Sequence, residues 1–153
     1  MRKLTDFLYA FSITLWVGGL WAIGYVVAPT LFHELPANRT LAGNLAGNMF
    51  AMIAWVGIGC AGYLVLFLFL RRGLAAFRSG VFWLVLLMLL LTLAGHFGVQ
   101  PIMAQLKAEA LPREVMESVL RDRFARWHGV SSVLYLIQSL LGAALVALQQ
   151  RGK

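Results

Sequence analysis

The sequence predicts an all-α integral membrane protein: an antiparallel bundle of four transmembrane helices, with an amphipathic surface helix before the last span. Of the 153 residues, 61% are hydrophobic and only 12% are charged, whereas soluble domains contain about 25% charged residues. The charged residues leave four uncharged stretches of 27, 31, 28 and 24 residues, at positions 7–33, 40–70, 79–106 and 127–150. Each stretch exceeds the roughly 20 residues that a transmembrane helix needs.

A third observation also favours helices, because no segment shows the alternating apolar and polar residues of a transmembrane barrel. We expect a single transmembrane domain, 1–153, with spans at approximately 5–33, 41–70, 80–104 and 127–149 and a surface helix at approximately 111–125. The first apolar stretch is longer than the core of a signal peptide and is followed by no A-x-A cleavage site, so we expect it to remain as a span.

In the first span, Gly18, Ala22, Tyr25, Pro29 and His33 recur at helical spacing and share one face. Pro29 lacks a backbone N–H, which predicts a kink or a termination near the outer end of this span.

In the second span, Gly43 and Gly47 form a GxxxG pattern, which allows helices to approach closely in lipid. Asn44 and Asn48 lie beside it, and the stripe continues through Trp55, Gly59 and Gly62. We expect this stripe to pack inside the bundle, and we keep association with a second copy or a membrane partner through Gly43 and Gly47 as the alternative.

The third span is uniformly apolar until Thr92, after which Thr92, His96, Gln100 and Met103 lie on one face. The surface helix that follows is amphipathic, and its charges favour Glu117–Arg121 and Asp122–Arg126 pairs one helical turn apart.

The fourth span carries a polar and small stripe, which indicates a face directed into the bundle because lipid offers such residues no partner. Its members step by three and four residues: His128, Ser131 or Ser132, Tyr135, Gln138 or Ser139, and Gly142. The segment RWHGVSS, residues 126–132, is therefore expected to act as a hinge between the surface helix and this stripe.

The basic residues flank the spans, which indicates contact with anionic lipid headgroups and excludes nucleic acid as the expected partner. Seven cations lie on the side of the termini and six on the other side. Because most of the six fall in the surface helix, we expect both termini in the cytoplasm.

All three histidines fall on the outer side of the membrane in this topology. His33 ends the first span, His96 lies near the outer end of the third, and His128 begins the fourth. The spacing therefore predicts an outward-facing site in which His96 and His128 are the principal metal ligands and His33 supports them. The other expected pocket residues are Tyr25, Asn44, Asn48, Gln100, Ser131 and Tyr135.

Several ligands fit this pattern. Imidazole suits copper and zinc, and Met49, Met52 and Met103 would favour copper(I), while histidines across a helix bundle also ligate haem. The polar residues could instead only hold helices together, in a structural or accessory protein. Catalysis is the weakest class, because no carboxylate is evident that would orient His128 toward Ser131.

The segments LWVGGLWAIGYVVAPTLF, LAGNLAGNMF and FARWHGVSSVLYLI resemble the four-span domain-of-unknown-function 4149 family, which is transmembrane protein 205-like. That resemblance implies a multi-pass protein of the bacterial inner membrane without a settled biochemical function; the eukaryotic relatives are linked to tolerance of metal-containing drugs.

The pattern W-x-G-G-L at Trp16 to Leu20, together with Phe32-His33, is more faintly similar to the HemJ-type oxidase and the CopD-type copper protein, which implies haem or copper. Those haem-linked proteins carry a histidine early in the first span, where this chain has Phe11 and Ser12.

Overall fold

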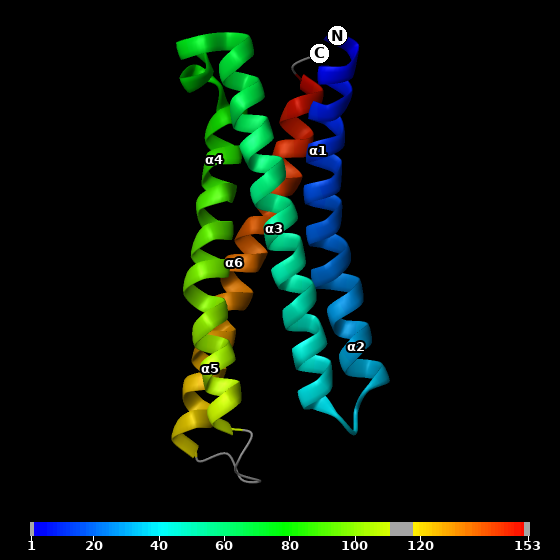
Figure 1. Ribbon diagram of the computed structural model, residues 1–153, viewed down its shortest axis with the longest axis vertical. Helices are drawn as coiled ribbons and strands as arrows, with labels where there is room; N and C mark the ends of the chain where they lie inside the picture. Colours follow the sequence, from blue (N-terminus) through cyan, green and yellow to red (C-terminus); the bar gives the residue numbers. More distant parts are fainter. Residues whose placement is uncertain (1, 111–117, 152–153) are drawn as a thin grey trace.

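The computed structural model describes residues 2–110 and 118–151. Within these residues, four helical runs are long and apolar enough to cross a membrane, which confirms the predicted four-span helical architecture. The runs extend over Lys3–Glu34, Arg39–Arg78, Gly80–Glu109 and Val119–Gln149. Both chain termini lie at the same end of the bundle, so successive spans run antiparallel (Figure 1).

The first three runs each combine two or three elements, and the fourth is a single helix. In chain order the elements are α1 (Arg2–Ala22), η1 (Ile23–Val27), α2 (Ala28–Glu34), α3 (Arg39–Arg72), η2 (Gly73–Arg78), α4 (Gly80–Leu93), η3 (Ala94–Val99), α5 (Gln100–Ala110) and α6 (Ser118–Arg151). The helices α1 and α4 each pack against both α3 and α6, which closes the bundle.

The bundle has two halves that differ in packing. We call residues 3–20, 56–92 and 138–151, which lie toward the chain termini, the terminal half. Residues 21–55, 93–110 and 118–137 form the distal half, which corresponds to the predicted outer side. In Figure 1 the distal ends of the helices lie as two pairs, α2 beside α3 and α5 beside α6, in agreement with the contacts between them.

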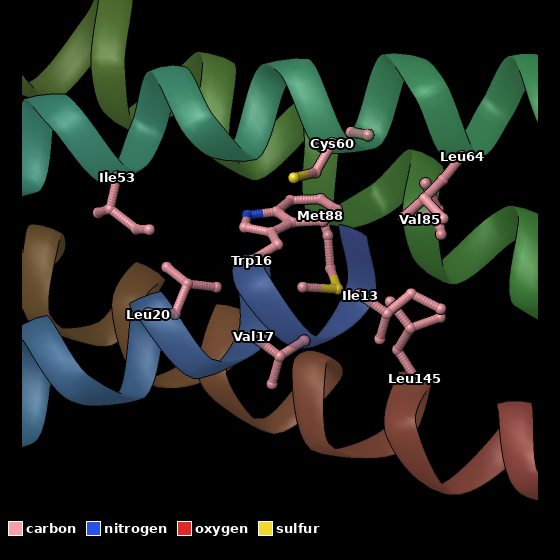
Figure 2. Packing of buried hydrophobic residues seen from close by; sticks show 11 residues of the cluster. Ile13, Trp16, Val17, Leu20, Ile53, Cys60, Leu64, Val85, Met88 and Leu145 are labelled. Carbon is pink, nitrogen blue, oxygen red and sulfur yellow. The ribbon is translucent and has the colours of Figure 1, made fainter. Parts of the chain in front are cut away.

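The hydrophobic core lies mainly in the terminal half, and Figure 2 shows most of its members converging from all four spans. Trp16 of α1 is fully buried at its centre. Its indole lies directly against Gly57 of α3, where a Cβ atom would overlap the ring. Since apolar lipid provides no hydrophobic driving force between helices, this close approach stabilises the bundle through dispersion contacts.

Two π-helical segments, η1 and η3, interrupt the described spans, and both lie in the distal half. Each of them ends two residues before a proline, Pro29 in α2 and Pro101 in α5. A proline ring clashes with the carbonyl group four residues earlier, and that carbonyl falls inside the π-helical segment in both cases. The kink that Pro29 predicts is therefore accommodated by a wider helical turn before the proline.

The two halves of the chain repeat one layout. An interrupted helix with a π-helical segment and a proline is followed by a straight helix, α3 in the first half and α6 in the second, and each straight helix has 34 residues. The chain is thus built from two consecutive helical hairpins, α1–α3 and α4–α6.

The expected hinge at residues 126–132 is wrong, because α6 runs without a break from Ser118 to Arg151. Gly129 is the one residue of weak helix propensity in this segment, and a single glycine does not end a helix. Residues 118–125 of the expected surface helix are accordingly the first turns of α6, and residues 111–117 lie outside the described residues.

Candidate functional site

His96 is the one histidine that the bundle partly buries, and it lies in the π-helical segment η3. Its Nδ1 atom lies 2.9 Å from Oε1 of Gln100, one turn further along the same span. The imidazole also meets the indole of Trp55 on α3 edge to face, with ring centroids 5.0 Å apart. These contacts fix the plane of the imidazole between α3 and η3.

The hydrogen bond to Gln100 also determines what His96 can do chemically. With the Gln100 amide oriented so that its oxygen faces Nδ1, this bond selects the tautomer that carries the proton on Nδ1. In the neutral imidazole, Nε2 then keeps its lone pair and can bind a metal ion or accept a hydrogen bond. Metal-ligating histidines usually donate their second ring N–H in this way, and the bond holds the ring in one orientation.

Tyr135 of α6, like His96, contacts several residues of the distal half. Its hydroxyl donates a hydrogen bond to the carbonyl of Leu20, just before η1. The ring lies over Gly24 of η1, where a Cβ atom would overlap it. It also contacts Phe50 of α3 and Tyr25 of η1, with centroid distances of 5.1 and 6.3 Å. Tyr135 therefore joins three spans at the first interruption.

Gln138, one turn further along α6, binds the span that contains the second interruption. Its Nε2 atom donates to the carbonyl of Met88 at 3.1 Å and to Oγ1 of Thr92 at 2.9 Å. Its Oε1 atom is buried without a hydrogen-bond partner among the described residues. Tyr135 and Gln138 thus bind the backbone just ahead of η1 and η3, respectively.

The polar stripe predicted on the fourth span therefore faces the bundle only in part. Gln138, Ser139 and Gly142 are buried and Tyr135 is half-buried, as expected. His128 and Ser132 are exposed instead, and Ser132 donates to the carbonyl of His128 on its own helix. Ser131 is half-buried.

The structure does not bring the three histidines together, contrary to the expectation from their shared depth. His33 lies at the end of α2, where its side chain is 85% exposed beside Glu34. His128 is exposed and stacks on Phe124 of its own helix. No group of three or more histidine, cysteine, aspartate or glutamate side chains is placed to hold a metal ion in the described part of the chain. Equal depth in a bundle does not specify which way a helix face points.

Asn44 and Asn48 are exposed, and neither side chain makes a hydrogen bond within the described residues. Trp55, Gly59 and Gly62 on the same face of α3 are also exposed, and no atom lies within 4 Å of a Cβ built at either glycine. The expectation that this stripe packs inside the bundle is wrong for the single chain. The face of α3 that packs inward in the distal half carries Ala42 and Ala46 instead, both buried.

Gly43 and Gly47 lie next to Lys107, which was not among the predicted site residues. Lys107 of α5 extends to α3 and donates from Nζ to the carbonyl of Gly43 at 2.9 Å. A Cβ at Gly43 or Gly47 would lie 3.8 or 3.7 Å from Nζ. These are ordinary contact distances, so the lysine does not require glycine at either position; its hydrogen bond links the two helix pairs of the distal half.

The sequence did not predict that Lys107 binds Gly43, that Trp55 contacts His96 or that Phe50 contacts Tyr135. It placed Gln138 on the inward face but did not predict its bonds to Met88 and Thr92. A usable signal for the interruptions was present, because Pro29 and Pro101 both follow glycine-containing segments near the ends of their spans. No comparable signal identified Lys107, since its partner is a backbone carbonyl.

Comparison with known protein families gives one match, over residues 11–112, to the family described as Domain of unknown function (DUF4149). The chain belongs to this family. The matched region contains α2 to α5 with both interruptions, and it ends before α6. No curated protein and no solved structure matches the chain.

Proposed function

We propose that this multi-pass membrane protein binds a small ligand or a metal ion in its distal half, without catalysing a reaction, and that His96 is the principal contact. The observation that carries the proposal is the place of His96 within an interrupted helix. In many membrane transporters, interrupted helices at corresponding positions of two repeated units hold the binding site. Short π-helical segments are also frequent at functional sites.

The chemistry around His96 limits the ligand. Nε2 offers one lone pair, and the rings of Trp55 and Phe97 lie edge-on to the imidazole. This environment suits a small ligand that donates a hydrogen bond to Nε2 and contacts aromatic rings. A copper or zinc ion would find one imidazole here and would need additional donors, of which the half-buried Met103 lies two turns away on the same face.

Haem fits these residues less well. A haem iron between two histidines requires two imidazoles that face each other across the bundle. His33 and His128 are exposed at the ends of α2 and α6, where each contacts a neighbour on its own helix. We therefore retain the small ligand and the metal ion, and we do not propose haem.

Elemental analysis, an absorption spectrum and a ligand screen by thermal unfolding, all on one purified sample, would test the proposal. His96→Gln is expected to lose the bound metal or the ligand-dependent rise in unfolding temperature. His128→Gln is the matched control, because it removes an exposed imidazole in the same half. Equal binding by the wild type and His96→Gln would contradict the proposal, and equal loss in both variants would contradict the assignment to His96.

A second candidate function is that of an accessory protein that pairs with a second copy through α3. The exposed face with Asn44, Asn48, Gly59 and Gly62 favours it. A carboxamide both donates and accepts hydrogen bonds, so a two-fold axis along this face lets each asparagine bind its counterpart. The exposed glycines allow the two helices to approach closely.

Energy transfer between labelled copies in vesicles would measure this association. Gly59→Leu is expected to weaken it, whereas Gly18→Leu is the control, because Gly18 is equally open but lies on α1. A signal that neither substitution changes would rule out the α3 face.

We also propose a bacterial inner membrane location with both termini in the cytoplasm. The excess of lysine and arginine near the termini and in the α3–α4 connection supports this orientation. The test uses single cysteines, Ser79→Cys or Ala108→Cys, each in a Cys60→Ala background. A membrane-impermeant thiol reagent added to intact cells should label Ala108→Cys and leave Ser79→Cys unlabelled. Labelling of Ser79→Cys from outside would reverse the orientation.

A further inference from the structure

A shallow depression of about 290 Å³ lies on the surface of α6, in the turns before the apolar part of the span, and its described lining residues are Arg123, Arg126, Trp127 and Val130. Their spacing of three, four and seven residues places all four on one face of the helix. The site is separate from His96 and does not depend on the function proposed above.

The guanidinium groups of Arg123 and Arg126 in this depression have N–H donors without an acceptor among the described residues. Arg123 and Arg126 are exposed, and neither forms an ion pair within the described residues. The pair expected between Asp122 and Arg126 is therefore wrong, although the spacing of the two residues allows it. Two unpaired guanidinium groups at neighbouring positions of one face provide a site for an anion with several oxygen atoms.

The depression also changes from charged to apolar along the helix. Arg123 lies nearest the start of α6, and Val130 lies seven residues deeper, which is a rise of about 10 Å. Trp127 lies between them and is half-buried. Arginine followed by tryptophan and an aliphatic residue is the order in which a helix meets headgroups, the interface and acyl chains.

We propose that this depression binds the phosphate group of a membrane lipid. Arg123 and Arg126 donate hydrogen bonds to the phosphate oxygens, and Trp127 and Val130 contact the glycerol region and the upper acyl chain. A planar guanidinium matches the geometry of a phosphate, and the apolar end of the depression distinguishes a lipid from a free anion.

Native mass spectrometry of the detergent-solubilised full chain, titrated with phosphatidylglycerol, would measure this binding. The double variant R123Q/R126Q is expected to bind the lipid about tenfold more weakly, because it loses two charge-assisted sets of hydrogen bonds. R121Q is the matched control, because Arg121 is equally exposed at the same depth on the opposite side of the helix. Circular dichroism would establish that all variants are folded.

Two further titrations identify what is recognised. Diacylglycerol with the same acyl chains lacks the phosphate and should bind no more tightly to the wild type than to the double variant. Inorganic phosphate at millimolar concentration should leave the lipid bound. Wild-type lipid affinity in R123Q/R126Q, an equal loss in R121Q, or equally tight binding of diacylglycerol would each overturn the proposal. Displacement by inorganic phosphate would overturn the assignment to a lipid and identify a free-anion site.

Discussion

The terminal and distal halves are built from the same four spans, yet different interactions stabilise them. In the terminal half, Trp16, Leu64, Met88 and Leu145 are fully buried and pack against one another from different spans. In the distal half, α3 presents small buried residues such as Ala42 to its neighbours. Hydrogen bonds, aromatic contacts and a few buried apolar residues such as Ile53, Val99 and Leu106 connect the helices there.

This difference indicates which part of the bundle can change shape. A packed apolar core has few alternative arrangements, because any displacement opens voids. In the distal half, the hydrogen bonds of Tyr135 and Lys107 and the aromatic contacts of Tyr135 join helices that share fewer fully buried large side chains. We therefore expect the terminal half to be the more rigid part of the bundle and the distal half, with both interruptions, to be the part that adapts if the proposed ligand binds.

The largest expected effect of a substitution is in the terminal half. Trp16→Ala removes a fully buried indole and the dispersion contacts of the side chains around it, so it should lower the free energy of unfolding by more than about 2 kcal/mol. Unfolding in mixed detergent, followed by circular dichroism, measures it. Trp83→Ala is the control, since Trp83 is 55% exposed to the membrane, and its effect should be far smaller. Equal effects would mean that the terminal core does not carry the stability.

An intermediate effect is expected from Tyr135→Phe, which removes the hydroxyl but keeps the ring over Gly24. The lost hydrogen bond to Leu20 should lower the free energy of unfolding by about 0.6–1.7 kcal/mol. Amide hydrogen exchange should increase locally in η1. Tyr63→Phe is the matched control, because its hydroxyl binds a backbone carbonyl of the terminal half, at Thr5. Unchanged exchange in η1 would argue against a role for Tyr135 at the interruption.

The smallest effect on stability is expected from Lys107→Met. The lost hydrogen bond to Gly43 is offset in part by the removal of a charge from a half-buried position, so the free energy of unfolding should change by less than about 1 kcal/mol. The helix pairs should nevertheless move apart. Spin labels at Phe32→Cys and Ala108→Cys, with Cys60→Ala, would report a longer or broader distance distribution. An identical distribution would show that Lys107 does not hold the pairs together.

The spans were predictable because charge is excluded from hydrocarbon, and 79–106, for example, contains no charged residue. The inward position of Tyr135 and Gln138 was predictable for a related reason, since polar groups in lipid need partners. The predicted convergence of His33, His96 and His128 does not occur, because the sequence specifies depth along each helix but not rotation about its axis. Lys107 could not be found either, because any exposed backbone carbonyl is an equally suitable partner on sequence grounds.

The straight helices α3 and α6 have a consequence for the bilayer. Each has 34 residues and is therefore about 51 Å long, whereas the hydrocarbon layer is about 30 Å thick. The excess must extend into the headgroup layers or be accommodated by tilt. Because α6 is one unbroken helix through residues 126–132, a change in its tilt is expected to displace Arg123 and Tyr135 together. Membranes of different thickness are therefore expected to shift Tyr135 relative to Leu20 and the first interruption.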